Sequence, residues 1–327
     1  MMMKRYKPMV PTLVEIAPRN SQADWVYEVK YDGFRCLLYI KDAEQIELYS
    51  RNLINISCSF PEIVNEIKER MSDLLNYIPL IFDGELVILE SNYRASFEKI
   101  QVRGRTKAEK KVQQLAKEYP AHYLVFDLLN INGVELIHEP LLKRKEALYS
   151  LFHYIGIENT SLVNKSIKLN YIQFSRELEL TWQHVQKENG EGIVAKKTTS
   201  KWIEGTRTTE WLKIKNWKKA DFIITAFEKK NGYFHVGLHN GNKIIDVGLF
   251  SHGLSSIERD ALQQIMKNNA IHEDENFMYI NPSICVELKF LDWYKNEIRQ
   301  PRFSKFKLEK RWIDCTWEEA MMKVTKS

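Results

Sequence analysis

The residues best placed to do chemistry surround Lys30, in residues 28–35, which read Glu-Val-Lys-Tyr-Asp-Gly-Phe-Arg. A lysine acts as a nucleophile only after losing its proton, and its ordinary pKa of about 10.4 keeps it charged at neutral pH. Burial and neighbouring cations both lower the pKa of a lysine. Lys213 and Lys215 flank Ile214 in a predicted strand, so both side chains lie on one face. We therefore predict that these two lysines lower the pKa of Lys30 and activate it.

Each candidate residue also has a plain structural interpretation. The Asp-Gly pair that follows Lys30 lies between two apolar runs, which is typical of a β-hairpin. Asp83-Gly84 is compatible with a turn inside a strand pair, and Phe126 with an ordinary core position. Glu191 is compatible with a turn, but the glycines on both sides of it favour a close approach of the backbone to a ligand.

Composition indicates a globular protein with room for two domains. Of 327 residues, 44% are hydrophobic and 28% are charged. No apolar run approaches the ~18 residues of a membrane span, and the N-terminus lacks the apolar core of a signal peptide. Four scattered cysteines without a Cys-x-x-Cys pair argue against structural zinc and against a disulfide framework. We expect a reduced, cytoplasmic protein that does not bind membranes.

Basic residues are unevenly distributed, although the net charge is only +5. They gather in residues 103–111, 196–207, 213–219 and 295–311, and the last group also carries aromatic side chains. Such a mixture favours contact with nucleic-acid phosphates beside apolar packing. Within the second group, Lys196 and Lys197 are also compatible with simple surface charge.

The hydrophobic pattern predicts an α+β protein with a change of architecture near residue 217. Before it, we expect helices near 141–154 and 176–189, a helix that begins after Ser59 as its cap, and a basic loop over 103–107. Strands are expected near 25–30, 35–41, 45–49, 80–88, 123–129, 190–196 and 211–215. After it, we expect strands near 221–228, 232–239, 243–250, 284–293 and 311–316 with a helix near 254–267, which suits a small OB-type barrel. The predicted domains are 1–216 and 217–327, joined by a polar hinge at 216–220.

Six motifs in this order resemble those of the covalent nucleotidyltransferases. They are Lys30-Tyr31-Asp32-Gly33-Phe34-Arg35, Ser50-Arg51-Asn52, Asp83-Gly84-Glu85, Phe126-Asp127, Glu191-Gly192-Ile193-Val194-Ala195-Lys196 and Lys213-Ile214-Lys215. Within that superfamily the chain resembles the ATP-dependent DNA ligases, and in particular the ligase module of the bacterial end-joining enzymes called ligase D. The resemblance implies an antiparallel-sheet nucleotidyltransferase domain, similar to ATP-grasp, followed by an OB-fold domain.

The resemblance also implies a role for each motif. AMP from ATP would become attached to Lys30, with Lys213 and Lys215 as further catalytic residues. Glu28 would contact adenine, Phe126 would stack on it, and Arg35 and Glu85 would hold the ribose side. Glu85 and Glu191 would hold Mg²⁺ or Mn²⁺ through hard oxygen ligands. Arg51 and Arg103 would bind DNA, and Arg299 would serve pyrophosphate, although Lys307 and Glu309 depart from the family's C-terminal motif.

Other functions stay open at this point. An RNA ligase, an mRNA-capping guanylyltransferase and a non-catalytic nucleic-acid scaffold share parts of the pattern. An NAD-dependent ligase is disfavoured because its four-cysteine zinc module cannot be built from these cysteines. For the DNA ligase hypothesis the expected partners are nicked double-stranded DNA, the bacterial Ku protein and a polymerase module. The protein is expected to act as a monomer at the bacterial nucleoid.

Overall fold

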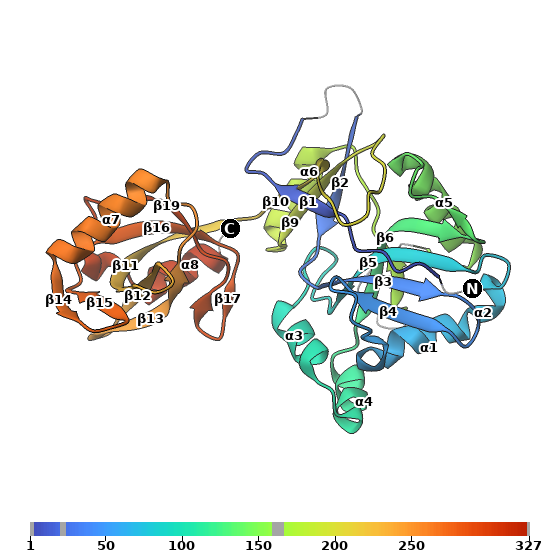
Figure 1. Ribbon diagram of the computed structural model, residues 1–327, viewed down its shortest axis with the longest axis horizontal. Coiled ribbons are helices and arrows are strands. Elements are labelled where there is room, and N and C mark those ends of the chain that lie inside the picture. The colour runs from blue at the N-terminus through green and yellow to red at the C-terminus, as the bar shows by residue number, and fades with distance from the viewer. Residues whose placement is uncertain (1–2, 20–23, 159–166, 326–327) are drawn as a thin grey trace. The chain divides into compact units, whose positions relative to one another are not determined.

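The computed structural model describes residues 3–19, 24–158 and 167–325 (Figure 1). The chain divides into two compact units, Met1–Asn216 and Trp217–Ser327, called unit 1 and unit 2 below. Within the described residues, no helix is both long and apolar enough to cross a membrane. The mixture of helices and mainly antiparallel sheets confirms the predicted α+β class.

Unit 1 contains two sheets. The four-stranded sheet has the order β1 (Val10–Leu13), β10 (Arg207–Lys215), β9 (Gly192–Lys197) and β2 (Trp25–Lys30). The six-stranded sheet has the order β4 (Ile46–Ser50), β3 (Phe34–Ile40), β5 (Leu80–Val87), β6 (His122–Ile131) and β7 (Val134–Glu135), with β8 (Leu169–Tyr171) also paired to β6. Because β2 and β3 belong to different sheets, the hairpin interpretation of the Asp-Gly pair is wrong. That pair joins the sheets, and a Cβ on Gly33 would lie 2.2 Å from the carbonyl oxygen of Leu86.

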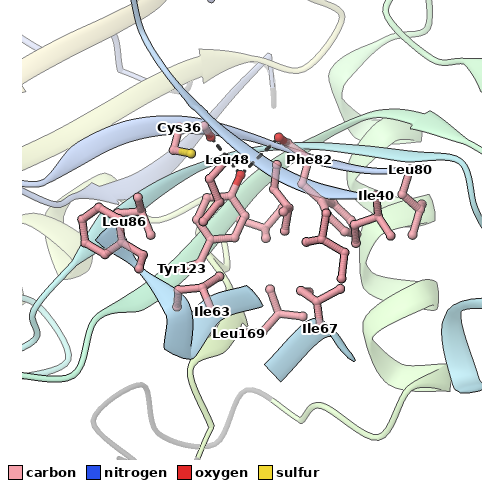
Figure 2. Close-up of a cluster of buried hydrophobic side chains, with 14 of the residues drawn as sticks. Cys36, Ile40, Leu48, Ile63, Ile67, Leu80, Phe82, Leu86, Tyr123 and Leu169 are labelled. Atoms are coloured by element: carbon pink, nitrogen blue, oxygen red, sulfur yellow. Dashed lines mark hydrogen bonds between the residues drawn. The ribbon is translucent and has the colours of Figure 1, made fainter. Parts of the chain in front are cut away.

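The six-stranded sheet is buried on both faces. Figure 2 shows one face, where Cys36, Ile40 and Phe82 meet the helix side chains Ile63 and Ile67. The hydroxyl of Tyr123 donates there to the carbonyl oxygens of Cys36 and Phe82, at 2.8 and 3.1 Å. The alternate side chains of β3 point to the other face and pack toward the four-stranded sheet. The space between the two sheets is therefore a second core, and it is where polar motif residues can be gathered.

Helices cover the outer faces of the two sheets. Those of unit 1 are α1 (Pro61–Glu69), α2 (Met71–Leu74), α3 (Phe97–Arg105), α4 (Glu109–Glu118), α5 (Leu141–Tyr154) and α6 (Leu178–Lys187). α5 packs on the six-stranded sheet and α6 on the four-stranded sheet. Both helices lie at the positions that the hydrophobic spacing predicts.

Three local predictions in unit 1 are wrong. Asp83-Gly84 lies in the middle of the continuous strand β5, because Gly84 has no Cβ to clash with the ring of Tyr123. The expected loop over 103–107 begins as the last turn of α3. Ser59 belongs to a 3-10 turn, η1 (Ser57–Ser59), and does not cap α1, which follows Phe60.

Unit 2 is built on a curled seven-stranded sheet. Its strands are β11 (Lys218–Glu228), β12 (Tyr233–Asn240), β13 (Lys243–Phe250), β14 (Ala270–Glu273), β15 (Phe277–Ile280), β16 (Cys285–Phe290) and β19 (Arg302–Phe306). The long strand β11 pairs with β12, β15 and β16, and a short ribbon joins β17 (Trp293–Tyr294) to β18 (Glu297–Ile298). Helix α7 (Ser256–Asn268) begins with a capping box made by Ser255 and Glu258.

The C-terminal end of unit 2 differs from the prediction. The strand expected over 311–316 is absent there, and the segment instead forms the turn η2 (Trp312–Asp314). Helix α8 (Trp317–Thr325) follows and packs on β11 and β12. Strands β14, β15 and β19 were not predicted, because each is only four or five residues long and gives little periodic signal.

Most of the segment predicted as a hinge, residues 216–220, is bonded into one unit or the other, and its role as a hinge stays a prediction. The backbone N–H of Asn216 donates to Glu191, at 2.8 Å, and its side chain donates to Gly190, at 3.2 Å, both within unit 1. Lys218 already pairs with Phe290 in unit 2. The change from one unit to the other therefore takes place at Trp217.

Candidate active site between the two sheets of unit 1

A cavity of about 180 Å³ lies between the two sheets of unit 1. It is lined by side chains from both sheets and by the N-terminal segment. The lining residues are Pro8, Val10, Pro11, Glu28, Val29, Lys30, Tyr31, Arg35, Arg51, Glu85, Phe126, Ile172, Val194, Lys196, Trp211 and Lys213. Residues proposed from six separate motifs are thus brought to one place.

Strand register explains how the lysines meet. Across the four-stranded sheet, Lys30 and Lys215 are both paired with Gly192. One step further along, Glu28 and Lys213 are both paired with Val194. Because alternate residues of a strand share a face, these side chains lie on the side toward the cavity.

The glycine at the centre of this register has a structural reason. Gly192 has a φ of +151°, and a Cβ there would lie 2.1 Å from the carbonyl oxygen of Ile214. The prediction that the glycines around Glu191 mark close approach to a ligand is therefore corrected for Gly192. The close approach is to the neighbouring strand β10.

Lys30 is held by a carboxylate. Its Nζ lies 2.5 Å from Oε2 of Glu191, and the side chain of Glu191 is only 7% exposed. Burial lowers the pKa of Lys30, but the charges of Glu191, Glu85 and Asp32 outweigh burial, so the net pKa is raised. The predicted lowering by Lys213 and Lys215 is wrong for this state of the site, because carboxylates are the closer charges.

The depressed lysine pKa values belong to the other two lysines. Burial lowers the pKa of Lys215 to about 8; Glu191 opposes this, and the charges of Lys30 and Lys213 add to it. Burial and the charge of Lys30 also lower the pKa of Lys213. Burial raises the pKa of Glu85 to about 8, against the opposing charges of Lys30 and Arg35. These shifts indicate a partly buried, charge-rich site of the kind found where proteins do chemistry.

Two carboxylates in this cluster suit a divalent cation. Glu85 and Glu191 interact electrostatically, and both carry the hard oxygen atoms that Mg²⁺ prefers. Across residues 3–19, 24–158 and 167–325, no three His, Cys, Asp or Glu side chains are grouped closely enough to hold a metal alone. Mg²⁺ is commonly held by one or two carboxylates together with substrate phosphates, so the donor set fits a metal that arrives with a nucleotide.

Arg35 is fixed by Asp83, a motif residue to which the sequence analysis assigned no role of its own. Its guanidinium forms two parallel hydrogen bonds with Asp83, at 3.0 and 2.7 Å. Asp83 also accepts a hydrogen bond from the indole of Trp202, at 2.9 Å. Arg35 lies 5.1 Å from the ring centre of Phe126, which lines the cavity and is also part of the core between the sheets. The core interpretation and the site interpretation of Phe126 are therefore compatible.

Glu28 lines the cavity and belongs to a buried charge cluster. Its two oxygens contact Lys145, at 2.6 Å, and Lys196, at 2.7 Å. Lys196 is 3% exposed and lies 4.1 Å from the ring centre of Trp211, so the interpretation of Lys196 as surface charge is wrong. Its alternation with Val194 on β9 was the signal that could have placed it inside. Lys145, on α5, gave no such signal.

The three arginines predicted to contact DNA or pyrophosphate differ in position and exposure. Arg51 is exposed in the turn after β4 and lines the cavity. The side chain of Arg103 is 0% exposed, so its predicted DNA contact is wrong. It instead binds both oxygens of Glu62, at 2.6 and 3.0 Å, and the carbonyls of Ser59 and Tyr119, each at 2.8 Å. Arg299 lies in unit 2, and its role stays a prediction.

The C-terminal motif residues make contacts inside unit 2. Lys307 lies 3.7 Å from Asp221, and Lys310 contacts Asp221, at 3.1 Å, and Glu319, at 2.8 Å. These contacts tie the segment that follows β19 to β11. They account structurally for Lys310, whereas the roles of Lys307 and Glu309 toward a nucleotide stay open.

Comparison with known proteins gives consistent matches. The family described as ATP dependent DNA ligase domain matches residues 2–215. A relative from Bacillus subtilis (strain 168), the bifunctional non-homologous end joining protein LigD, is 35% identical over 313 residues, which cover 96% of this chain and 51% of the relative. A DNA ligase from Thermococcus fumicolans is 24% identical over 328 residues, covering 93% and 56%. The chain thus spans about half the length of these relatives.

A solved structure shows the fold. The ligase domain from M. tuberculosis LigD superposes with a TM-score of 0.53 at 21% sequence identity. The superposition covers 95% of this chain and 98% of that domain.

Proposed function

Because the chain belongs to the family of ATP-dependent DNA ligases, we propose that it seals nicks in duplex DNA through AMP attached covalently to Lys30. The observation that carries this proposal is the position of Lys30 at the cavity, with Glu191, Lys213 and Lys215 around it. This group holds one nucleophile, two cations for phosphate charge and a carboxylate that contacts the nucleophile.

In the first step, Nζ of Lys30 attacks the α-phosphorus of ATP. A nitrogen–phosphorus bond forms, and the bond from that phosphorus to pyrophosphate breaks. The ammonium proton of Lys30 has to leave first, and Oε2 of Glu191 is the acceptor that Nζ already contacts, at 2.5 Å. Lys213 and Lys215 would stabilise the charge that develops on the phosphoryl oxygens. Glu85 and Glu191 would hold a divalent cation, whose charge would favour the unprotonated form of Lys30 and offset the charge of the phosphates.

In the later steps, the 5′-phosphate of the nick would take AMP from Lys30, and the 3′-hydroxyl would then displace AMP. Arg51 is our candidate for binding the 5′-phosphate, because it is exposed at the rim of the cavity. For the nucleotide itself, Phe126 would stack on the base and Arg35 would hold the ribose side, oriented by Asp83. Glu28 offers only acceptor oxygens, which suits the amino group of adenine.

The test is incubation with α-labelled ATP and magnesium. The wild-type protein should become labelled, and the label should be acid-labile and base-stable, as expected for a phosphoramidate. Lys30→Ala should abolish labelling, whereas the control Lys197→Ala removes a lysine that is 42% exposed and should retain it. A label that persists in Lys30→Ala would refute the assignment. The labelled protein should then transfer AMP to nicked DNA; transfer to nicked RNA alone would favour an RNA ligase.

For the biological role, we propose DNA repair by bacterial non-homologous end joining. The support is the 35% identity to the Bacillus subtilis protein of that name. The candidate partners are Ku and a polymerase module, and the site of action would be the nucleoid. For unit 2 we propose an OB-type barrel, supported by the curled sheet around β11. Stimulation of end joining by added Ku would test the role.

A further inference from the structure

Helices α3 and α4 adjoin each other at one corner of unit 1 (Figure 1), and this stretch of the chain carries several exposed cations. Arg105, Lys107, Lys110 and Lys111 are all exposed, and Glu109 is the only acidic residue among residues 105–111. We call these seven residues the α3–α4 corner. In the described part of the chain, none of the four cations lies within ion-pair distance of an acidic side chain; Lys111 donates only to Gln114, at 3.3 Å. Their charge is therefore not neutralised within the protein.

Contacts of the adjoining residues Arg103 and Gly104 hold the corner in place. Arg103 ties the end of α3 to α1 through Glu62 and to the end of α4 through the carbonyl of Tyr119. Gly104 packs so closely on Phe34 that a Cβ there would lie 2.0 Å from its ring. Phe34 immediately precedes Arg35, which lines the cavity. The corner is therefore fixed to the strand that carries part of the candidate active site.

We propose that the α3–α4 corner binds the phosphate backbone of duplex DNA next to the nick. The proposal rests on the proposed function, since it needs a nicked duplex at Lys30. Exposed lysines and arginines on a preorganised surface contact phosphates regardless of sequence, as an enzyme that seals any nick requires. Single-stranded nucleic acid is the less suitable partner, because its binding surfaces use aromatic side chains for stacking and residues 105–111 contain none.

Binding through phosphates predicts a dependence of affinity on salt concentration, and this dependence can be measured. Affinity for DNA falls as salt is added, and each phosphate neutralised by a lysine makes the slope of log affinity against log salt concentration steeper by about 0.9. The double variant Lys107→Gln/Lys110→Gln removes two cations of the corner. The double variant should make that slope less steep by roughly 1.8 and should weaken binding at 0.1 M salt by tenfold or more. The matched control, Lys68→Gln/Lys187→Gln, removes the same charge from exposed positions on α1 and α6.

The experiment measures binding of a blunt duplex with one central nick by fluorescence anisotropy, over a series of KCl concentrations. Labelling of Lys30 by ATP, which needs no DNA, is measured on the same preparations. We expect Lys107→Gln/Lys110→Gln to be labelled normally, to bind the duplex more weakly and to show a less steep salt dependence. The variant Lys107→Arg/Lys110→Arg, which keeps both charges, should bind the duplex with the affinity and salt dependence of the wild type. An unchanged slope, or an equal loss in the control pair, would overturn the proposal. Absence of labelling in the wild-type protein would instead refute the proposed function.

Discussion

Replacing Lys215 with arginine should change how formation of the Lys30 adduct depends on pH. Burial lowers the pKa of Lys215 to about 8, so its positive charge is lost as the pH rises through that value. Arginine stays charged over the whole accessible range, because its pKa exceeds 12. Under the proposed function, the substitution therefore keeps a cation beside the α-phosphate of ATP at pH values where the wild-type protein loses one.

The size of the effect follows from the titration. With a pKa of about 8, Lys215 is roughly 90% charged at pH 7 and about 10% charged at pH 9. Because Glu191 raises the pKa of Lys30, the fraction of Lys30 present as free amine increases steadily from pH 7 to pH 9 in both proteins. That common factor cancels in a ratio. The kcat/KM of Lys215→Arg divided by that of the wild type should rise about tenfold between pH 7 and pH 9, since kcat/KM reports the free enzyme.

The assay is adduct formation from α-labelled ATP and magnesium, at ATP concentrations well below KM. Lys197→Arg serves as the control, because the Lys197 side chain is 42% exposed and lies outside the cavity lining. Its ratio to the wild type should stay constant with pH. A constant ratio for Lys215→Arg as well would show that the charge of Lys215 does not act in the first step.

Two further predictions concern buried charges. Arg103→Ala leaves the buried carboxylate of Glu62 unpaired and should reduce the free energy of unfolding by about 3–5 kcal/mol in urea denaturation. The control Val102→Ala, at a neighbouring residue that is 42% exposed, should change the free energy of unfolding little. Equal losses in the two variants would show that the Arg103–Glu62 pair does not stabilise the fold. Lys145→Met removes the partner that lies 2.6 Å from Glu28 and should raise KM for ATP in adduct formation by roughly tenfold or more, while weakening the preference for ATP over GTP. Lys145→Arg should restore both values, and an unchanged KM in Lys145→Met would show that Glu28 needs no such support.

Local patterns in the sequence identified the parts of this site. The alternation of Lys213 and Lys215 around Ile214 placed both lysines on one face, because neighbouring residues of a strand always point to opposite sides. The apolar spacing over 141–154 predicted α5 for an equally local reason. The order of the six motifs indicated the family without any knowledge of which strands pair.

The charges around Lys30 depended on the tertiary structure. The sequence places Lys30 beside Asp32 and predicts help from Lys213 and Lys215. The fold instead brings Glu191, 161 residues away, within 2.5 Å of Nζ, and so reverses the expected direction of the pKa shift. Electrostatic effects depend on distance and burial, and neither is a property of a short stretch of chain.

Burial explains why two other predictions, for Arg103 and Lys196, were wrong. Arg103 and Lys196 belong to basic stretches that look like solvent-exposed charge, yet both side chains are enclosed and paired with carboxylates. What the sequence by itself determined was the set of residue types, their order and the face of the strand or helix on which each lies. Packing between segments far apart in sequence decided which of these residues meet, which are exposed to solvent and which are buried in the core, since only that packing removes water from a charge.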